Sequence, residues 1–138
     1  MIALTLKSAK RFGVRYSTLT PVASGAWVVD RMKLHKGPFL LICTHQDSLY
    51  TIIRPEKKIG SLEELVEEIQ RSVPHVSLNS RFRLHKNGNR SVTGSMNDMK
   101  NLIRHGLHLG NVPHMETIVN DCPFSAIGYD RPKNRILA

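Results

Sequence analysis

The chain has 138 residues, a formal net charge of +9, 41% hydrophobic residues and 22% charged residues. This length allows one domain and little more, and the composition is that of a globular protein rather than a disordered one. We therefore expect a single domain over residues 1–138 with a buried core. The sequence contains no unmistakable catalytic or cofactor motif, so it does not by itself identify a function.

The basic excess is unevenly distributed along the chain. Residues 56–70 have a net charge of −3, whereas the segments before and after them each have a net charge of +6. A small basic protein attracts polyanions such as nucleic acid or an acidic protein. An excess of Lys and Arg also keeps a protein soluble, so charge alone leaves both interpretations open.

Cysteine usage and hydropathy point to a cytoplasmic protein. Cys43 and Cys122 are the only cysteines, and they have neither metal-binding nor disulfide spacing, so we expect both to be reduced core residues. The longest apolar run, Phe39–Cys43, is far too short to span a bilayer, and the amino terminus lacks the pattern of a signal peptide.

The first half of the chain predicts a short strand at Met1–Leu6, then a helix capped by Ser8 that ends near Gly13. Three β segments follow as an antiparallel meander: Ala26–His35, Phe39–His45 and Ser48–Arg54. Phe39–Cys43 is apolar at every position, which predicts a strand that is covered on both faces.

The pattern at Ser61-Leu62-Glu63-Glu64 is a capping box, because the Ser61 hydroxyl can accept from the Glu64 amide while the Glu64 carboxylate returns to Ser61. A helix over 61–73 is expected, with its apolar residues at helical spacing and Pro74 at its end. The capping and dipole rules explain the glutamates at its start without a functional role.

The second half predicts a strand at Arg81–Lys86 with a basic outer face, then helices at 95–105 and 113–122. Ser95 is expected to open the first of these helices and Gly106 to stop it, and the tail over 124–132 is expected to be a loop. Together these elements predict an α+β fold, with a mostly antiparallel sheet of four or five strands and about three helices packed on one face.

Two groups of basic residues are candidates for contacts with nucleic-acid phosphates. The strand supplies Arg81, Arg83, His85 and Lys86, and the first helix supplies Lys10 and Arg11. Aromatic residues make up only 6% of the chain, so no stacking platform for single strands is evident. Backbone contact is therefore favoured over sequence-specific readout.

A second candidate is an anion or ligand site where a turn leads into a helix, because free amides at a helix start bind anions. Its residues are Arg90, Ser91, Ser95, Asn97 and Asp98. Arg90 could grip a phosphate, although Asp98 would repel an anion and the phosphate-loop pattern is absent. The alternative is a second capping box formed by Ser95 and Asp98.

The histidines at 105, 108 and 114 raise the question of a zinc site. No fourth ligand is evident, so we interpret them as surface residues and expect neither a metal nor a cofactor. Ser, His and Asp are all present, but no motif places them in a hydrolase triad.

The order of several motifs resembles a bacterial family of small proteins of unknown function. The resemblance covers nearly the whole chain and is carried by Trp27, Tyr50, the string Arg90-Ser91-Val92-x-Gly94-Ser95-Met96-Asn97-Asp98 and the tail Pro123-Phe124-Ser125-Ala126-Ile127-Gly128-Tyr129. That family commonly has a His and an Asn after the Trp, and in this chain Val28 and Asp30 stand near those positions. The resemblance implies the same fold plan and a site at Arg90, Ser95, Asn97 and Asp98, but no activity.

The leading hypothesis is a non-enzymatic protein that binds a polyanion, either nucleic acid or a nucleic-acid-associated complex, in a mobile-element, toxin–antitoxin or phage-conflict system. An enzyme acting on a phosphate or nucleotide through the turn at 90–98 is one alternative. A protein-interaction module with an acidic partner is another. No membrane partner is expected, and the sequence leaves the oligomeric state open.

Overall fold

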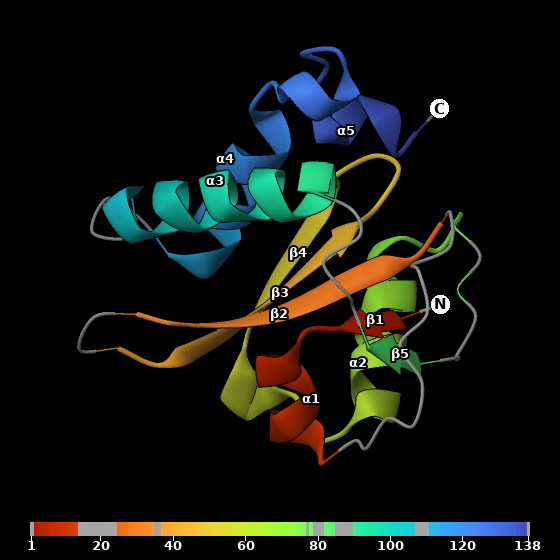
Figure 1. The fold of residues 1–138 in the computed structure, drawn as a ribbon, viewed down its shortest axis with the longest axis vertical. Helices are drawn as coiled ribbons and strands as arrows, with labels where there is room; N and C mark the ends of the chain where they lie inside the picture. Colours follow the sequence, from red (N-terminus) through yellow and green to blue (C-terminus); the bar gives the residue numbers. More distant parts are fainter. Residues whose placement is uncertain are drawn as a thin grey trace.

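A computed structural model of the chain describes residues 2–13, 25–34, 37–76, 78, 82–84, 90–106 and 111–137, without the side chains of 82–84, 90 and 91. Its strands form one five-stranded sheet in the order β4-β3-β2-β1-β5 (Figure 1). Their bounds are β1 (Ile2–Leu4), β2 (Trp27–Lys33), β3 (Phe39–His45), β4 (Thr51–Pro55) and β5 (Phe82–Leu84).

The sheet is mixed, which corrects the expectation of a mostly antiparallel one. The predicted meander is confirmed: β3 pairs antiparallel with β2 and with β4, so that Ile42 lies opposite Asp30 on one side and Ile53 on the other. However, β1 runs parallel to both of its neighbours, β2 and β5. The reason is the connection between the strands. The helix α1 (Leu6–Phe12) lies between β1 and β2, and such a crossover carries the chain back so that the second strand runs in the same direction as the first.

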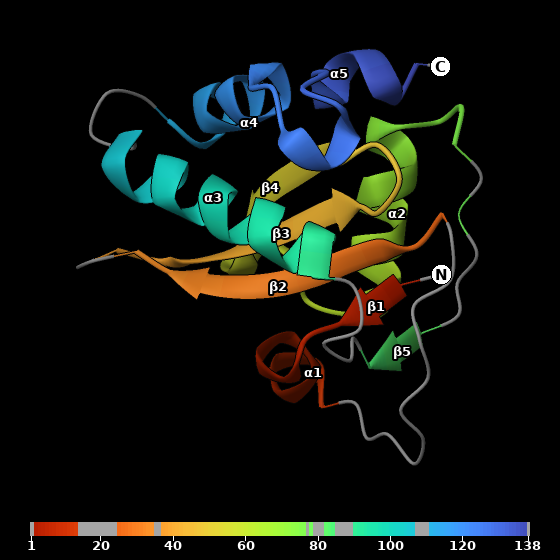
Figure 2. The same ribbon diagram turned by 45° about the horizontal axis from the view of Figure 1, so that its top comes forward.

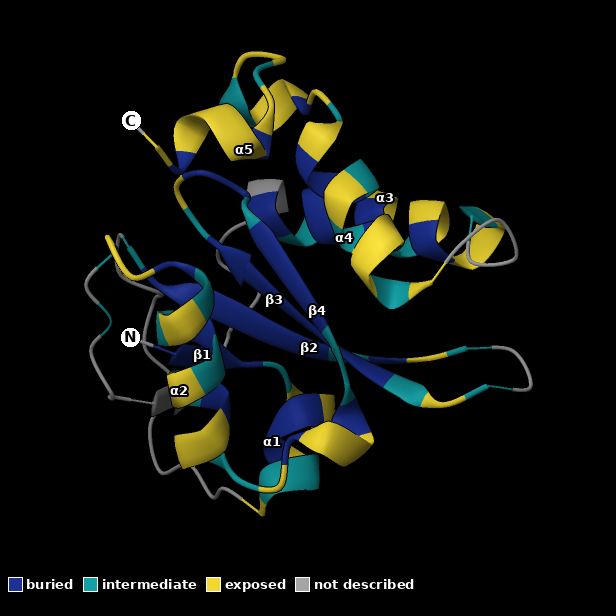
Figure 3. Ribbon diagram, turned by 180° about the vertical axis from the view of Figure 1, so that it is seen from behind, coloured by how far each residue is buried: buried dark blue, intermediate teal, exposed yellow. Residues whose placement is uncertain are grey.

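Helices cover both faces of the sheet, so the expectation that they pack on one face is wrong. The helices α1 (Leu6–Phe12) and α2 (Leu62–Ser72) cover one face, and α3 (Arg90–Gly106) and α4 (Val112–Asp121) cover the other (Figures 1 and 2). Trp27 and Val29 on β2 belong to the first core, whereas Val28 and Met32 belong to the second. Because β2 is apolar on both faces, each face needs its own cover, as the buried strands in Figure 3 show.

The helix ends follow capping rules, at partly different residues from those expected. The cap of α1 is Thr5, whose Oγ1 accepts from the Ser8 amide, while Ser8 itself is buried and donates to the Val29 carbonyl at 2.7 Å. Gly13 ends α1 with a positive φ of 67°. At the start of α2, Ser61 caps as predicted, but the Glu64 carboxylate accepts from the Gly60 amide rather than from Ser61.

The long helix α3 begins at Arg90, five residues before the expected start at Ser95. Ser95 is buried inside the helix, so it does not form the capping box that its spacing with Asp98 suggests. Gly106 is the last residue of α3 rather than a left-handed stop. Its missing side chain has a packing role instead, since a Cβ there would lie 3.0 Å from Cε of Met115 on α4.

The carboxyl-terminal tail contains structure where a loop was expected. The short helix η3 (Ser125–Ile127) precedes α5 (Pro132–Arg135), and Ile136 then enters the core beneath α1 and α2. The Ile136 carbonyl lies 2.8 Å from Nε2 of His75, just after α2. The tail therefore ties the α4 side of the molecule to the α2 side.

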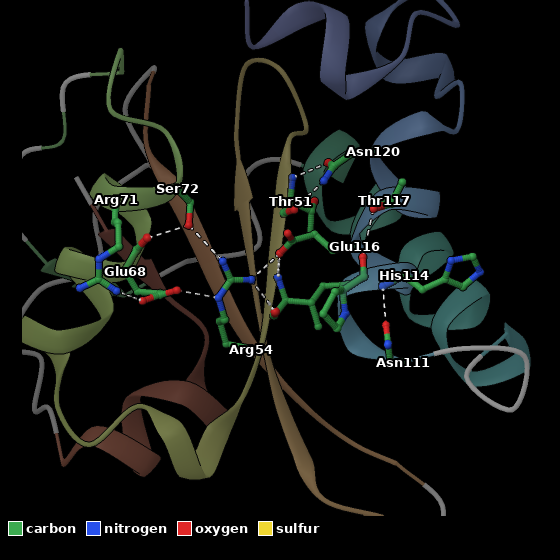
Figure 4. Close-up of polar contacts among 12 residues, drawn as sticks. Thr51, Arg54, Glu68, Arg71, Ser72, Asn111, His114, Glu116, Thr117 and Asn120 are labelled. Carbon is green, nitrogen blue, oxygen red and sulfur yellow. Dashed lines mark hydrogen bonds and ion pairs between the residues drawn. The ribbon is translucent and has the colours of Figure 1, made fainter.

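Side chains of α4 complete the hydrogen bonding of the edge strand β4. The Asn120 side chain accepts from the Thr51 amide and donates to the Thr51 carbonyl, both at 2.8 Å (Figure 4). Glu116 accepts from the Ile53 amide, also at 2.8 Å. An uncovered edge strand is a template for pairing with another chain, so these contacts protect the sheet as well as fixing α4.

Candidate functional site

The structure describes only part of the basic strand that the sequence predicted as a nucleic-acid contact. Arg81, His85 and Lys86 lie outside the described residues, and Arg83 is placed on β5 by its backbone alone. The two candidates on α1 are described: Lys10 is exposed and Arg11 is half-buried. The described part of the predicted basic surface is therefore α1 and the elements that contact it.

Arg11 points into a junction of three elements, whose centre is Glu56 on the short helix η1 (Glu56–Lys58). Arg11 Nε donates to Glu56 Oε1 at 2.9 Å, and Arg31 of β2 donates to both carboxylate oxygens. Burial alone would raise the pKa of Glu56, but the hydrogen bonds from Arg31 and Arg11 outweigh it and hold the pKa below its ordinary value. The junction joins α1, η1 and β2. Because Arg11 is paired with Glu56 inside it, Arg11 is not free to contact a ligand.

Five exposed lysines surround this junction and have no such partner. None of them forms an ion pair within the described ranges, and they lie on α1, η1 and the end of β2: Lys7, Lys10, Lys57, Lys58 and Lys33. We call this set the α1–η1 basic surface. Figure 1 shows α1 beside the 56–58 segment at the lower edge of the molecule.

An aromatic platform lies next to these lysines. The Arg31 guanidinium lies 3.6 Å from the centroid of the Phe39 ring, and Lys33 Nζ lies 5.6 Å from the same centroid. Both contacts follow from the register of the hairpin, in which Lys33 pairs with Phe39. The half-buried ring orients the Arg31 guanidinium, which also holds Glu56.

Sequence reasoning missed most of this surface. Lys57 and Lys58 belong to the segment 56–70, which was treated as acidic because its net charge is −3, and Lys33 was assigned only to a strand. The signal that could have found them is the position of Glu56-Lys57-Lys58 directly after the meander. Glu56 is buried between two arginines, and the two lysines that follow it are exposed.

The predicted anion site at 90–98 does not form as the sequence suggested. Ser95 is buried within α3, while Asn97 and Asp98 are exposed beyond its first turn, so none of the three lies at the helix start. The side chains of Arg90 and Ser91 lie outside the described residues. A role for those two in binding an anion stays a prediction.

The other charged networks of the described residues hold the fold together. Lys100 of α3 pairs with Asp30 of β2, and Thr5 also donates to Asp30 at 2.7 Å. Burial favours a raised pKa for Asp30, but the hydrogen bonds from Lys100 and Thr5 outweigh it and lower the pKa below its ordinary value. This pair fastens α3 to the sheet.

Arg54 on β4 links the helices of both faces (Figure 4). Its guanidinium donates to Glu68 of α2 at 2.8 Å, to Glu116 of α4 at 2.6 Å and to Ser72 at 3.0 Å. Burial opposes the charged form, but the hydrogen bond to Glu68 and the charge of Glu116 prevail and raise the pKa of Arg54 above its ordinary value. We interpret this network as structural.

The remaining chemical groups form no metal site within the described ranges. His105 and His114 are exposed, His108 lies outside those ranges, and no three potential ligands are placed to share a metal ion in the part that is described. Cys43 is buried, which raises the pKa of its thiol to about 12. Among the described residues, no helix has the length and apolar character to cross a bilayer.

Comparisons with known proteins gave no match to a family model, to a curated protein or to a solved structure. The resemblance carried by the Arg90–Asp98 string stays a prediction.

Proposed function

We propose that this protein binds a polyanion of the nucleic-acid type through the α1–η1 basic surface. The observation that carries the proposal is the gathering of five exposed lysines without ion-pair partners around the Glu56 junction. Their like charges repel one another, and within the described residues no carboxylate pairs with them. A ligand with closely spaced negative charges would remove that repulsion.

The internal arrangement of the junction suits such a role. Glu56 forms ion pairs with both Arg11 and Arg31, which offsets part of their charge, and the lysines around them remain exposed to solvent. Arg31 is stacked on Phe39, so α1, η1 and the β2–β3 hairpin hold a fixed relation to one another. The lysines therefore project from a rigid base, which lowers the entropy lost when they contact phosphates.

The contacts available are those of phosphate binding rather than base reading. Lysine ammonium groups attract phosphates and release condensed counterions from the nucleic acid, which makes affinity fall steeply with salt. This agrees with the expectation from the sequence that backbone contact prevails over sequence-specific readout. The proposal extends to Arg81, Arg83, His85 and Lys86, which the sequence predicts as phosphate contacts.

The test is binding of a fluorescent DNA or RNA duplex to the full chain, followed by anisotropy. The variant Lys57→Gln/Lys58→Gln should weaken binding by about tenfold or more at 100 mM salt, because each lost phosphate contact removes roughly one counterion release. The matched control is Arg104→Gln/Arg135→Gln, which removes the same charge from exposed positions on α3 and α5.

Equal weakening by both double variants would mean that only net charge matters, and the assignment to this surface would be wrong. Absence of duplex binding by the wild-type chain, together with capture of an acidic protein that depends on Lys57 and Lys58, would support the protein-interaction alternative instead. An enzymatic role through the turn at 90–98 has less support, since α3 does not begin at Ser95.

A further inference from the structure

A groove of about 700 Å³ lies between α3, α4 and the segment around η3, on the face of the sheet opposite the α1–η1 basic surface. Its apolar lining includes Leu102 of α3, Met115 and Ile118 of α4, and Phe124. The close approach of α3 and α4 at Gly106 brings Met115 into the lining. Volumes of this order hold small organic ligands.

Three polar side chains from one helix line the same groove. Asp98, Asn101 and His105 lie at spacings of three and four residues along α3, so they share a helix face. No Lys or Arg is among the described lining residues, although Arg104 of α3 donates to Oδ1 of Asn101 at 3.4 Å, and Asp98 forms no ion pair within the described ranges. In a chain with a net charge of +9, this lining favours an uncharged or cationic ligand that donates hydrogen bonds.

Tyr129 adds an exposed aromatic ring to the lining. It is 73% exposed and has a φ of 61°, a left-handed conformation that is strained for a residue other than glycine. Backbone hydrogen bonds fix it: the Tyr129 amide donates to the Phe124 carbonyl at 2.9 Å, and the Phe124 amide donates to the Asp130 carbonyl at 3.2 Å. A large ring held in solvent by a strained backbone stabilises nothing visible in the fold, and such strain concentrates at functional sites.

We propose that this groove binds a nucleobase that carries an amino group, with its ring against Tyr129 and its edge toward Asp98. The chemistry matches at each point, because a base offers a flat face for stacking and an edge that donates to a carboxylate. Nδ2 of Asn101 can donate to a ring nitrogen beside Asp98 and so complete the pairing with the edge, while its Oδ1 accepts from Arg104. The apolar floor accommodates the remainder of the ring.

The half-buried Cys122 takes no covalent part in this site. It also lines the groove, where burial and the charge of Asp121 raise the pKa of its thiol above the ordinary value. The thiol therefore stays protonated near neutral pH and serves as a small apolar wall.

The experiment is calorimetric titration of the full chain with adenosine, guanosine, cytidine and uridine, which carry no phosphate. We expect binding of at least one of the three nucleosides with an amino group in preference to uridine. Asp98→Asn should weaken this binding about tenfold, since it removes a charged acceptor, and Tyr129→Asn should weaken it about fivefold or more by removing the stacking face. The control Asn97→Ala alters an exposed α3 residue outside the lining and should leave the affinity unchanged.

The inference is overturned if none of the four nucleosides binds below about 10 mM, a Kd equivalent to only a few kcal/mol. It is also overturned if Asp98→Asn and Tyr129→Asn bind as the wild-type chain does. Because nucleosides lack phosphate, Lys57→Gln/Lys58→Gln should not change this titration. Failure here leaves the polyanion proposal standing, and failure of duplex binding leaves this site standing.

Discussion

Asn120 provides the sharpest test of how the edge of the sheet is held. Its amide makes two 2.8 Å hydrogen bonds to the backbone of Thr51, and both residues are buried, with exposed fractions of 5% and 0%. In Asn120→Ala the Thr51 amide and carbonyl both lose their partner, and each such buried group costs about 1–3 kcal/mol. We expect the free energy of unfolding to fall by about 2–5 kcal/mol, which corresponds to a decrease in Tm of roughly 6–20 °C.

The measurement is equilibrium unfolding in urea followed by circular dichroism. The matched control is Asn97→Ala, because Asn97 is an exposed residue of α3 and its replacement carries the same gain in helix propensity without the backbone contacts. That variant should stay within about 0.5 kcal/mol of the wild type. A loss below about 1 kcal/mol in Asn120→Ala, or one equal to the control, would refute the reasoning that α4 completes the hydrogen bonding of β4.

Three further predictions concern the charged networks and the strained loop. Arg54→Met should lower the free energy of unfolding by about 2–4 kcal/mol in urea titrations, because it leaves Glu68 and Glu116 without their partner; an unchanged midpoint would contradict the structural role of this network. The pKa of Glu56 is lowered in the fold, so its stabilising contribution is present above its unfolded pKa of about 4.3 and is lost as pH falls through the folded pKa. Glu56→Gln should therefore flatten the decline in Tm that the wild-type protein shows below about pH 5. An identical decline in both proteins would contradict the role of Glu56 in the junction. Tyr129→Asn should leave the Tm unchanged or raise it by a few degrees, because Asn tolerates a positive φ; a lower Tm would show that the ring stabilises the fold.

Local patterns predicted the meander and the helix α2 well. The continuous apolar run Phe39–Cys43 and the capping box at Ser61 depend on neighbours in the sequence, and the structure has β3 and α2 where they were expected. Helical spacing also predicted that Met96, Met99, Leu102 and Ile103 face inward; the first two and Ile103 are buried in α3, whereas Leu102 is exposed. Periodicity reports which face of an element is apolar, which is the information these predictions needed.

Long-range geometry was not available from the same patterns. The parallel pairing of β1 with β2 and β5 depends on crossovers, and a strand of three residues carries little signal of its partner's direction. Ser95 resembled a helix cap because serine is a common cap, but the apolar stripe of α3 includes Val92, three residues earlier. The apolar stripe therefore starts before Ser95, close to the helix start at Arg90.

For the candidate sites too, the sequence predicted individual residues but not how the fold brings them together. Lys10 and Arg11 were identified from charge, but only the fold brings Glu56 between Arg11 and Arg31 and leaves Lys57 and Lys58 beside them. Asp98 was singled out as part of an anion site, whereas the structure places it in a groove with no cation in its lining. Charge in the sequence predicted a kind of partner, and its location required the tertiary structure.

The most direct test of the proposed function is the dependence of duplex affinity on salt between 50 and 200 mM. Five phosphate contacts predict a slope of log K against log salt of about −4.5, which is roughly a 500-fold loss over this range, and Lys57→Gln/Lys58→Gln should reduce the slope to about −2.7. The charge-matched variant Arg104→Gln/Arg135→Gln should keep the wild-type slope. A wild-type affinity that does not change with salt, or a slope that the lysine variant leaves unaltered, would contradict polyanion binding by the α1–η1 basic surface.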